Sequence, residues 1–461
     1  MERSTILFIS IAALFFLEGS ATGQPDNTIH ISWTAHNQGN IQLTVSNGGS
    51  FGGNDFTNPV PDPLTGDPVN LCTFPKNSEL LYWLFAHLAI GGVYEGDTLV
   101  SWREFYPEDG ASGLFSFSTL DPTRSYYDSA TTAELDIMTA YNDVRTDSEL
   151  VDPDPGTGRP HRPLGLHIVQ HSMAWSGAKI GNFIIIRLLI RSELPKPIRD
   201  VYVGVSYTGG PRHVDYFGDK IDREYEGFLR YDFKNDCHHV EELNIGYAMS
   251  KAGDPVNGHF DYRSPLGAVG FMILGIPADT GTLSYNWWQF RSGYTERFFQ
   301  PRKKPPTGRH TFSMFPPDSP IPSDRSMYSL MSNGEIDYDQ ATCAVDHSSD
   351  GWLPPQEGAA EVADGGLTNK LLAAGPFNLN PGATAEFTLA LVAGDSVHHD
   401  PTAYDRLFDP QHPGMFTRQL RFQNLAENAR WAKWVYDNPG FDTDGDGYRG
   451  KFRICNGDTF W

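Results

Sequence analysis

Alternation of apolar and polar residues within positions 164–209 is the feature that most constrains how this chain can fold. Every second residue of the segment Asn182–Ser192 is a large aliphatic: Ile184, Ile186, Leu188 and Ile190. Arg187 and Arg191 have the opposite parity. Because successive side chains of a strand point to opposite faces, we predict a strand here with a buried even-numbered face and a wetter odd-numbered face.

Similar segments flank this one. Leu164–Ser176 and Arg199–Thr208 are predicted strands, and turn-forming tripeptides separate the three segments: Gly177-Ala178-Lys179 and Pro195-Lys196-Pro197. Together they predict an antiparallel meander whose apolar face needs a second sheet to cover it. The 46 glycines, 33 prolines and 13% aromatic residues also favour a turn-rich all-β protein. We predict a large antiparallel β-sandwich, of one or two packed modules, with one C-terminal helix and long irregular loops.

The first 23 residues have the pattern of a secretory signal peptide. Arg3 precedes an apolar run at Ile6–Leu17, and small residues follow at Ala21-Thr22-Gly23. A transmembrane anchor is the alternative, but this run is too short to span about 30 Å of hydrocarbon. No later stretch is long and apolar enough to span either. We therefore expect a mature chain without a membrane span, secreted to the extracellular space or displayed at the cell surface.

The charge of the chain excludes some classes of partner. With 35 basic and 57 acidic residues, the formal net charge is −22. Such a surface repels nucleic acid and anionic lipid, and it tolerates divalent cations.

We divide the chain into four segments after the signal peptide. Residues 24–70 are expected to form a β-hairpin and a connector, and residues 71–400 the main β-sandwich. A loop-rich stretch at 299–374 is long enough to carry function or to wrap an edge. Residues 401–440 are a helical segment, because Asn424 and Glu427 have capping-box spacing and Asp437-Asn438-Pro439-Gly440 ends the helix. Residues 441–461 form an Asp-rich loop and a tail.

The Asp-rich loop is the sharpest motif. Asp442, Asp444 and Asp446 occupy alternate positions, Gly447 follows them, and Tyr448 can add its backbone carbonyl. This is the first half of a calcium loop, in which carboxylates converge on one ion because the glycine turns the chain. Arg453 replaces the bidentate glutamate of an EF-hand, so the pattern is closer to the loops of thrombospondin type 3 and dockerin modules. A solvated acidic turn is the alternative to a structural calcium site.

The four cysteines leave two readings open. Cys72, Cys237, Cys343 and Cys455 are an even number in a chain that we expect to be exported, which predicts two disulfides. Free buried cysteines are the alternative, because four cysteines do not make a disulfide scaffold of a large domain.

Aromatic residues and histidines supply the remaining candidate sites. Four tryptophans are candidates for a platform that contacts glycans, with core packing as the alternative reading: Trp175, Trp287, Trp288 and Trp352. Two histidine clusters, at 236–242 and 398–400, could hold a transition metal, but solvated loop histidines are the simpler interpretation. Catalytic residues cannot be chosen from 57 carboxylates without distances.

Several segments resemble large exported proteins of environmental bacteria, a family with no established activity. The likeness rests on Gly92–Ser101, Gly158–Ser176, Asp200–Val205, Asn286-Trp287-Trp288, Ala390–Asp395 and Leu425–Asp446. Those proteins often continue beyond the calcium-like motif into fibronectin-type modules and a sorting domain, whereas this chain stops at Trp461, as a fragment would. The resemblance implies export and surface display, and it assigns no catalytic residue.

Two functions remain open at this stage. The first is a secreted or surface-displayed, calcium-stabilised β-sandwich protein of structural, adhesive or glycan-contacting type, with polysaccharide or other surface components as partners. The second is a secreted carbohydrate-active enzyme on the same fold, with the 299–374 loop over its cleft. Fold class alone does not decide between them.

Overall fold

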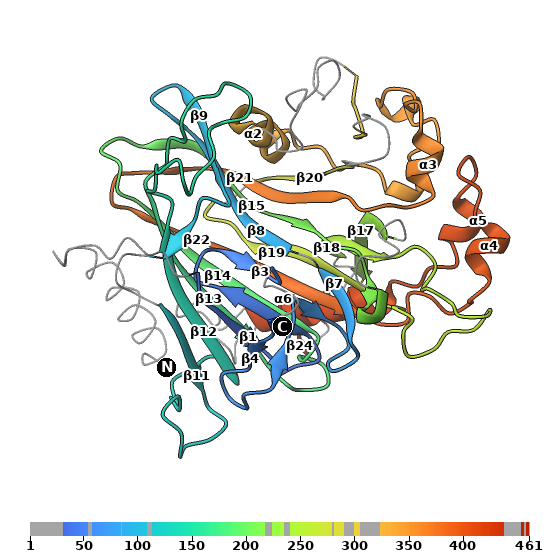
Figure 1. Cartoon of the computed structure of the whole chain (residues 1–461), viewed down its shortest axis with the longest axis horizontal. Helices are drawn as coiled ribbons and strands as arrows, with labels where there is room; N and C mark the ends of the chain where they lie inside the picture. The colour runs from blue at the N-terminus through green and yellow to red at the C-terminus, as the bar shows by residue number, and fades with distance from the viewer. Residues whose placement is uncertain are drawn as a thin grey trace.

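The chain folds into the predicted antiparallel β-sandwich (Figure 1). The computed structural model describes residues 31–53, 58–83, 85–107, 113–216, 224–234, 240–278, 281–289, 299–304, 323–437, 453–455 and 458–460. The predicted signal peptide lies outside these residues. In the part of the chain described, no helix combines the length and the apolar character needed to cross a membrane.

The larger sheet contains eleven described strands. Its order is β16 (Arg212–His213), β7 (Leu80–Trp83), β6 (Cys72–Thr73), β2 (Gln42–Ser46), β3 (Ser50–Phe51), β8 (Phe85–Tyr94), β15 (Ile198–Thr208), β21 (Asn369–Leu379) and β20 (Thr282–Trp288). Two further strands pair outside this path: β1 (Trp33–His36) with β2 and β9 (Asp97–Trp102) with β8. The N-terminal hairpin expected within 24–70 is therefore part of the main sandwich.

The smaller sheet contains nine described strands. Its order is β10 (Tyr106–Pro107), β12 (Leu135–Asn142), β13 (Leu166–Ala174), β14 (Phe183–Ser192), β22 (Thr384–Gly394), β19 (Ala268–Gly275), β18 (Val240–Ser250) and β17 (Glu224–Lys234), with β11 (Leu114–Ser118) beside β12. Two short hairpins are separate from both sheets: β4 (Val60–Pro61) with β5 (Pro68–Val69), and β23 (Arg453–Cys455) with β24 (Asp458–Phe460).

Five α-helices are described where the sequence predicted one. They are α2 (Asp324–Ser332), α3 (Ala359–Ala363), α4 (Ala403–Leu407), α5 (Gly414–Thr417) and α6 (Gln423–Asp437), with 3₁₀ turns η2 (Val214–Tyr216), η3 (Gln340–Thr342) and η4 (Ser348–Asp350). Only α6 was predicted. The others are too short to show a helical period in sequence, and tertiary packing decides them.

The core lies between the two sheets, and the alternation of β14 and β15 builds much of it. The even-numbered residues of β14, from Ile184 to Ile190, are at most 1% exposed and face the other sheet. The residues Val201, Val203 and Val205 of β15 enter the same cluster from the opposite side. The predicted buried face of Asn182–Ser192 is thus confirmed.

The predicted meander is only half right. β13 pairs with β14, but β15 belongs to the other sheet, where it lies between β8 and β21. The chain crosses between sheets at Pro195-Lys196-Pro197, where prolines lack the N–H that a continuing ladder would need. Alternation shows that a strand has one buried face, but it does not show which sheet the strand joins.

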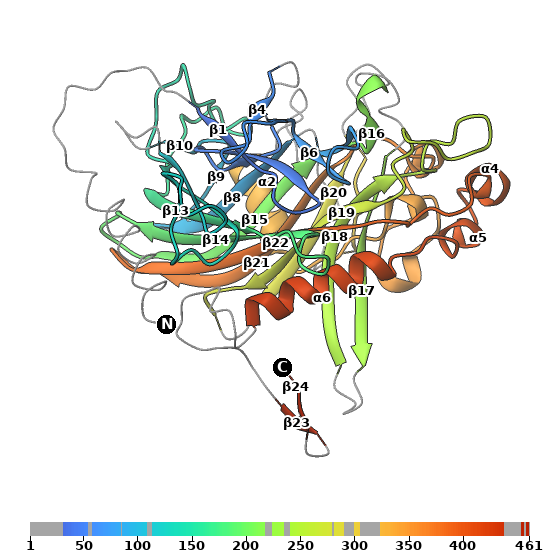
Figure 2. The same ribbon diagram turned by 90° about the horizontal axis from the view of Figure 1, so that it is seen from below.

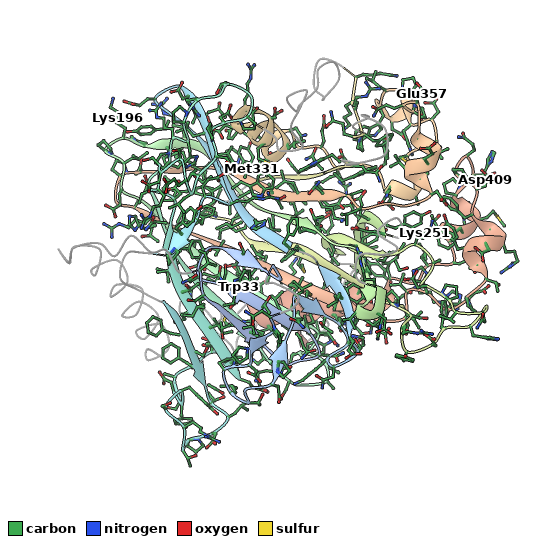
Figure 3. The ribbon with its side chains drawn as sticks, in the orientation of Figure 1. Trp33, Lys196, Lys251, Met331, Glu357 and Asp409 are labelled. Carbon is green, nitrogen blue, oxygen red and sulfur yellow. The ribbon has the colours of Figure 1, made fainter. Side chains whose placement is uncertain are left out.

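Helices cover the outer face of each sheet. On the smaller sheet, Phe183 and Ile185 pack under α6 through Leu425, Ala429 and Ala432 (Figure 2). On the larger sheet, Tyr202 and Trp288 pack under α2, which contributes Met331 to the contact (labelled in Figure 3). The odd-numbered face of β14 is consequently drier than predicted. Arg187 is only 7% exposed, and it is neutralised by Glu386 of β22, whose Oε2 lies 2.6 Å from Nη2.

The prediction of two disulfides is wrong. Cys72 in β6 and Cys343 after η3 are both buried and free. The Cys343 thiol donates instead to the carbonyl of Ala359, with an Sγ–O distance of 3.2 Å. The alternative reading, free buried cysteines, describes these two residues.

The register of β14 is tested by exchanging one residue on each face. Ile186→Asp should destabilise the chain by more than about 4 kcal/mol, because it removes buried aliphatic contacts and leaves a charge unpaired between the sheets. Arg191→Asp is the control at the half-exposed end of the odd-numbered face. It should lower the free energy of unfolding far less than Ile186→Asp. Urea unfolding of both variants measures the difference. Equal destabilisation would contradict the register.

Candidate functional site: a carboxyl-lined pocket between β9 and α2

A pocket of about 110 Å³ opens where the end of β9 meets the N-terminal half of α2 and the 150–161 loop. Trp102, Glu104 and Arg103 line it from the β9 side, and Asp324 and Met327 from α2. The 150–161 loop adds the rest of the wall: Leu150, Val151, Asp152, Pro153, Asp154, Pro155 and His161. Its volume is well below the roughly 300–1,000 Å³ of sites for drug-sized ligands. It therefore has room for one small group or one end of a larger molecule.

The 150–161 wall is held by a turn that the Asp154 side chain organises. Asp154 Oδ1 accepts from the N–H groups of Gly156 and Thr157, at 3.1 and 2.8 Å, and from the Thr157 hydroxyl at 2.7 Å. This is the local self-bonding that makes aspartate and glycine frequent in turns. The sequence Asp62-Pro63-Leu64-Thr65-Gly66 forms the same kind of turn elsewhere, where Asp62 accepts from Leu64 N and Thr65 Oγ1.

Asp154 also fixes the start of α2. Its Oδ2 accepts from the backbone N–H of Asp324 at 2.7 Å, and Ser323 Oγ accepts from Ser326 N at 3.2 Å as the N-cap. Arg159 then donates from Nη2 to Asp324 Oδ2 at 2.6 Å. The loop and the helix are thus joined by three charged groups, which positions Asp324 at the pocket.

The carboxyl groups of the pocket differ in protonation. Burial raises the pKa of Glu104 to about 8, against the hydrogen bond it accepts from Trp102 N. Burial, together with the neighbouring Asp154 charge, raises the pKa of Asp324 to about 7 despite the ion pair with Arg159. Burial also opposes the charge of Asp154, but its hydrogen bonds from Asp324 N and Thr157 outweigh that effect and lower its pKa. Near neutral pH the pocket therefore holds both protonated and ionised carboxyls.

Two residues of the pocket wall each carry a buried nitrogen that has no partner within the described residues. One is the indole nitrogen Nε1 of Trp102, which is a donor. The other is the ring nitrogen Nε2 of His161. His161 is hydrogen-bonded to the Asp143 backbone, and burial, with the nearby Arg159 charge, lowers its pKa to about 4. The ring is therefore neutral, and Nε2 can accept a proton or a hydrogen bond. Because an unpaired buried polar group costs about 1–3 kcal/mol, water or a ligand is expected to satisfy both atoms.

The pocket can therefore both donate and accept hydrogen bonds. Protonated Glu104 and Trp102 Nε1 can donate, whereas Asp154 and His161 Nε2 can accept. A hydroxyl group needs this combination, since it is itself a donor and an acceptor. A protonated carboxyl beside an ionised one is also the arrangement that general acid–base chemistry uses.

The predicted calcium ligands lie outside the described residues. Asp442, Asp444, Asp446 and Tyr448 follow α6, which ends at Asp437. Across the ranges that the structure describes, no group of three or more acidic, histidine or cysteine side chains could hold a metal ion. The calcium loop therefore stays a prediction.

The four predicted glycan-contacting tryptophans are buried. Trp287 and Trp288 are at most 1% exposed, Trp175 is 4% exposed and Trp352 is 6% exposed. Trp287 enters the core between the sheets, Trp288 packs under α2 and Trp175 packs on the α6 side. The structure therefore contains no surface platform made from these four rings, because tertiary packing uses their faces as core.

Of the two histidine clusters, the structure describes the one at 398–400, and it does not form a metal site there. Residues 235–239 lie outside the described ranges, and His398 is buried, with Nε2 2.6 Å from the carbonyl of Ser250. Elsewhere, buried His171 pairs with Asp136 at 3.0 Å, and His36 Nε2 lies 2.8 Å from Ser172 Oγ. These two histidines are core groups, each with a polar side chain as a neighbour.

Sequence reasoning missed every residue of the pocket. Residues 103–160 read as polar and irregular, and Asp152–Gly158 read only as a chain breaker. The local signal that was present is the Asp-Pro-x-Thr-Gly turn, which occurs twice. The partner of Asp154 is Asp324, 170 positions away, and no spacing rule connects them.

Comparisons with known proteins leave the chain unassigned. No family model matches it, and no curated protein matches it. Among solved structures, one match is a protein assigned as an aldose 1-epimerase, from Escherichia coli K12. The TM-score is 0.25 at 8% identity, and the match covers 79% of this chain and 100% of the other. A likeness this distant supports no inference about function.

The protonated carboxyls predict how stability depends on pH. The folded chain keeps protons on Glu104 and Asp324 that the unfolded chain releases near its ordinary pKa values of 4.5 and 3.8. Folding stability should therefore fall as the pH rises from about 4 to about 8, since the folded state binds more protons throughout that window. Glu104→Gln should make this decrease in folding stability smaller, because glutamine has no proton to release in that pH range.

Urea midpoints at about pH 5 and about pH 8 measure the effect for wild type and variant. Because Glu224 and Asp339 also have raised pKa values through burial, the test is the difference between the two proteins. Glu149→Gln, at an exposed position nearby, is the control for removing one charge. A Glu104→Gln curve parallel to that of the wild type would contradict the assignment.

Proposed function

We propose that this chain is a secreted or surface-displayed β-sandwich protein that contacts glycans, and that the pocket between β9 and α2 receives the hydroxyl-bearing edge of one sugar unit. The observation that carries the proposal is that the wall of one small pocket contains both polar atoms without a partner and a protonated carboxyl. The ring of Trp102 and Met327 supply apolar wall. A sugar presents hydroxyls that both donate and accept, together with apolar C–H faces, and this lining complements both.

Export is proposed on sequence grounds. The pattern of the first 23 residues and the resemblance to exported proteins of environmental bacteria support it. The net charge of −22 also suits an exposed, soluble surface.

A glycan array probed with the mature chain tests the proposal, followed by calorimetric titration of each ligand that binds. Trp102→Phe keeps an aromatic ring but removes Nε1–H, and it should weaken binding by about tenfold or more, as expected for one buried hydrogen bond. Glu104→Gln should weaken binding less than Trp102→Phe, because the amide that replaces the protonated carboxyl still donates a hydrogen bond.

Trp434→Phe provides the matched control, since it makes the same substitution on α6, away from the pocket. Binding that is unchanged in Trp102→Phe and Glu104→Gln would place the glycan site elsewhere. An array without any bound glycan would contradict the proposed function itself.

We further propose a structural calcium ion at Asp442, Asp444, Asp446 and the Tyr448 carbonyl. Three carboxylates at alternate positions repel one another without a cation, and Gly447 permits the turn. The ligand set is incomplete, so the affinity should be at the weak extracellular end, about 10⁻⁴–10⁻³ M.

Millimolar calcium should raise the midpoint of thermal unfolding relative to chelator, by the equivalent of about 1 kcal/mol. Asp444→Ala should abolish the response, and magnesium should substitute poorly because it requires a tighter octahedron. A wild-type midpoint that ignores calcium would show an acidic turn without an ion.

A carbohydrate-active enzyme is the second candidate, and the paired protonation states of Glu104 and Asp154 favour it. In this case Glu104 acts as general acid toward a leaving oxygen, while an ionised carboxylate assists water or the sugar. Release of reducing ends from polysaccharides that bind on the array would establish this activity. Glu104→Gln should then lower turnover more than binding, which distinguishes catalysis from simple recognition.

A further inference from the structure

A buried charge pair joins the two sheets, and neither of its residues lines the pocket. Lys370 of β21, in the larger sheet, contacts Glu224 of β17, in the smaller sheet, through Nζ and Oε1. Both side chains have no solvent exposure. Nζ also donates to the carbonyl of Thr368 at 3.2 Å, and it lies 5.7 Å from the centre of the Tyr207 ring. The amine is therefore held against the carboxyl from several sides.

A second carboxyl lies beside this pair. Glu226 is two residues from Glu224 on the same face of β17, whereas Tyr225 points to the opposite side under the α4 and α5 region. Glu226 Oε2 accepts from the Tyr285 hydroxyl. Its Oε1 is buried and has no partner in the described part of the chain. The charge of Lys370 acts on Glu226, so the three groups form one cluster.

The ionised form of this pair is costly. Removing an ammonium and a carboxylate from water is unfavourable for each ion, and their mutual attraction offsets this only in part. Burial raises the pKa of Glu224 to about 7 even with Lys370 and Arg212 nearby. The contact between Nζ and Oε1 is the path by which a proton can pass between the two groups, and the step needs a neutral amine against a neutral carboxyl.

We propose that Lys370 and Glu224 condense to an amide that covalently links the two sheets. The lone pair of Nζ attacks Cδ of Glu224, and a tetrahedral intermediate forms. The Nζ–Cδ bond then remains, the Cδ–Oε1 bond breaks, and Oε1 leaves as water with the two protons that Nζ gives up. No oxidant, reductant or cofactor enters the balance. The product is neutral, so the cost of two buried charges is removed together with the water.

Glu226, on the same face of β17 as Glu224, is the acid that we assign to this step. Burial raises the pKa of Glu226 well above its ordinary value, although the Lys370 charge acts in the opposite direction. Such a carboxyl can donate to the departing oxygen and take a proton from nitrogen. Arg212 also faces Glu224, and Asp254 remains near Arg212 as a counter-charge once Glu224 is consumed.

Intact-mass measurement of the purified, denatured and reduced chain tests the proposal. The wild type should be lighter than its sequence by one water molecule. Proteolytic mapping should yield one branched peptide that joins the Glu224 and Lys370 segments. The Lys251–Asp364 pair is an internal control, because its Nζ–Oδ2 distance is 3.4 Å but its carboxylate is 62% exposed, and it should stay unlinked (Lys251 is labelled in Figure 3).

Two variants separate the chemistry from folding. Lys370→Met lacks the nucleophile and should have its full sequence mass. Glu226→Gln keeps both reacting groups but removes the acid, and it should fold while showing a strongly reduced fraction of the linked form. Equal linkage in Glu226→Gln would overturn the role of Glu226.

A wild-type chain at its full sequence mass would overturn the proposal. Loss of water that maps to another place, such as a succinimide at Asp350-Gly351, would overturn it as well. These measurements do not depend on the glycan pocket, so failure of either proposal leaves the other intact.

Discussion

The structure depends on the burial of both faces of its central strands. β14 presents Ile184 and Ile186 to the core between the sheets, while Phe183 and Ile185 face α6. β15 has the same property, with Val203 toward the core and Tyr202 toward α2. A strand that is apolar on both faces cannot lie at a water surface, so each sheet requires a helix on its outside. The helices are thus a consequence of the strands, although they come late in the chain.

The pocket follows from this arrangement. α2 covers the larger sheet, and its first residue is held by Asp154, so the 150–161 loop is pinned beside β9. Carboxyls at this junction are half-removed from water because the helix and loop surround them, and this raises the pKa of Glu104 and of Asp324. The chemistry of the pocket is therefore a result of covering the sheet.

Local patterns predicted the local structure well. The alternation of apolar and polar residues correctly predicted β13, β14, β15 and the buried face of β14. The residues typical of helix ends correctly predicted α6. The same patterns failed where partners are distant. They placed β15 in the wrong sheet, and they could not distinguish Trp287 as a surface platform from Trp287 as core. The pocket depends on Glu104, Asp154 and Asp324 meeting in space, and sequence separation carries no information about that meeting.

The order of strands has a consequence for how the chain reaches this state. β14 pairs with β22, and their residues Arg187 and Glu386 are 199 positions apart in sequence. β15 likewise pairs with β21, which comes much later in the chain. Loop-closure entropy must be overcome before such contacts contribute, so assembly is slow compared with that of a protein built from neighbouring segments. A nascent chain that has not yet reached residue 394 leaves one edge of β14 without its neighbour. The ladder on that edge, and the part of the core that β22 supplies, can therefore form only after the last third of the sequence has been made.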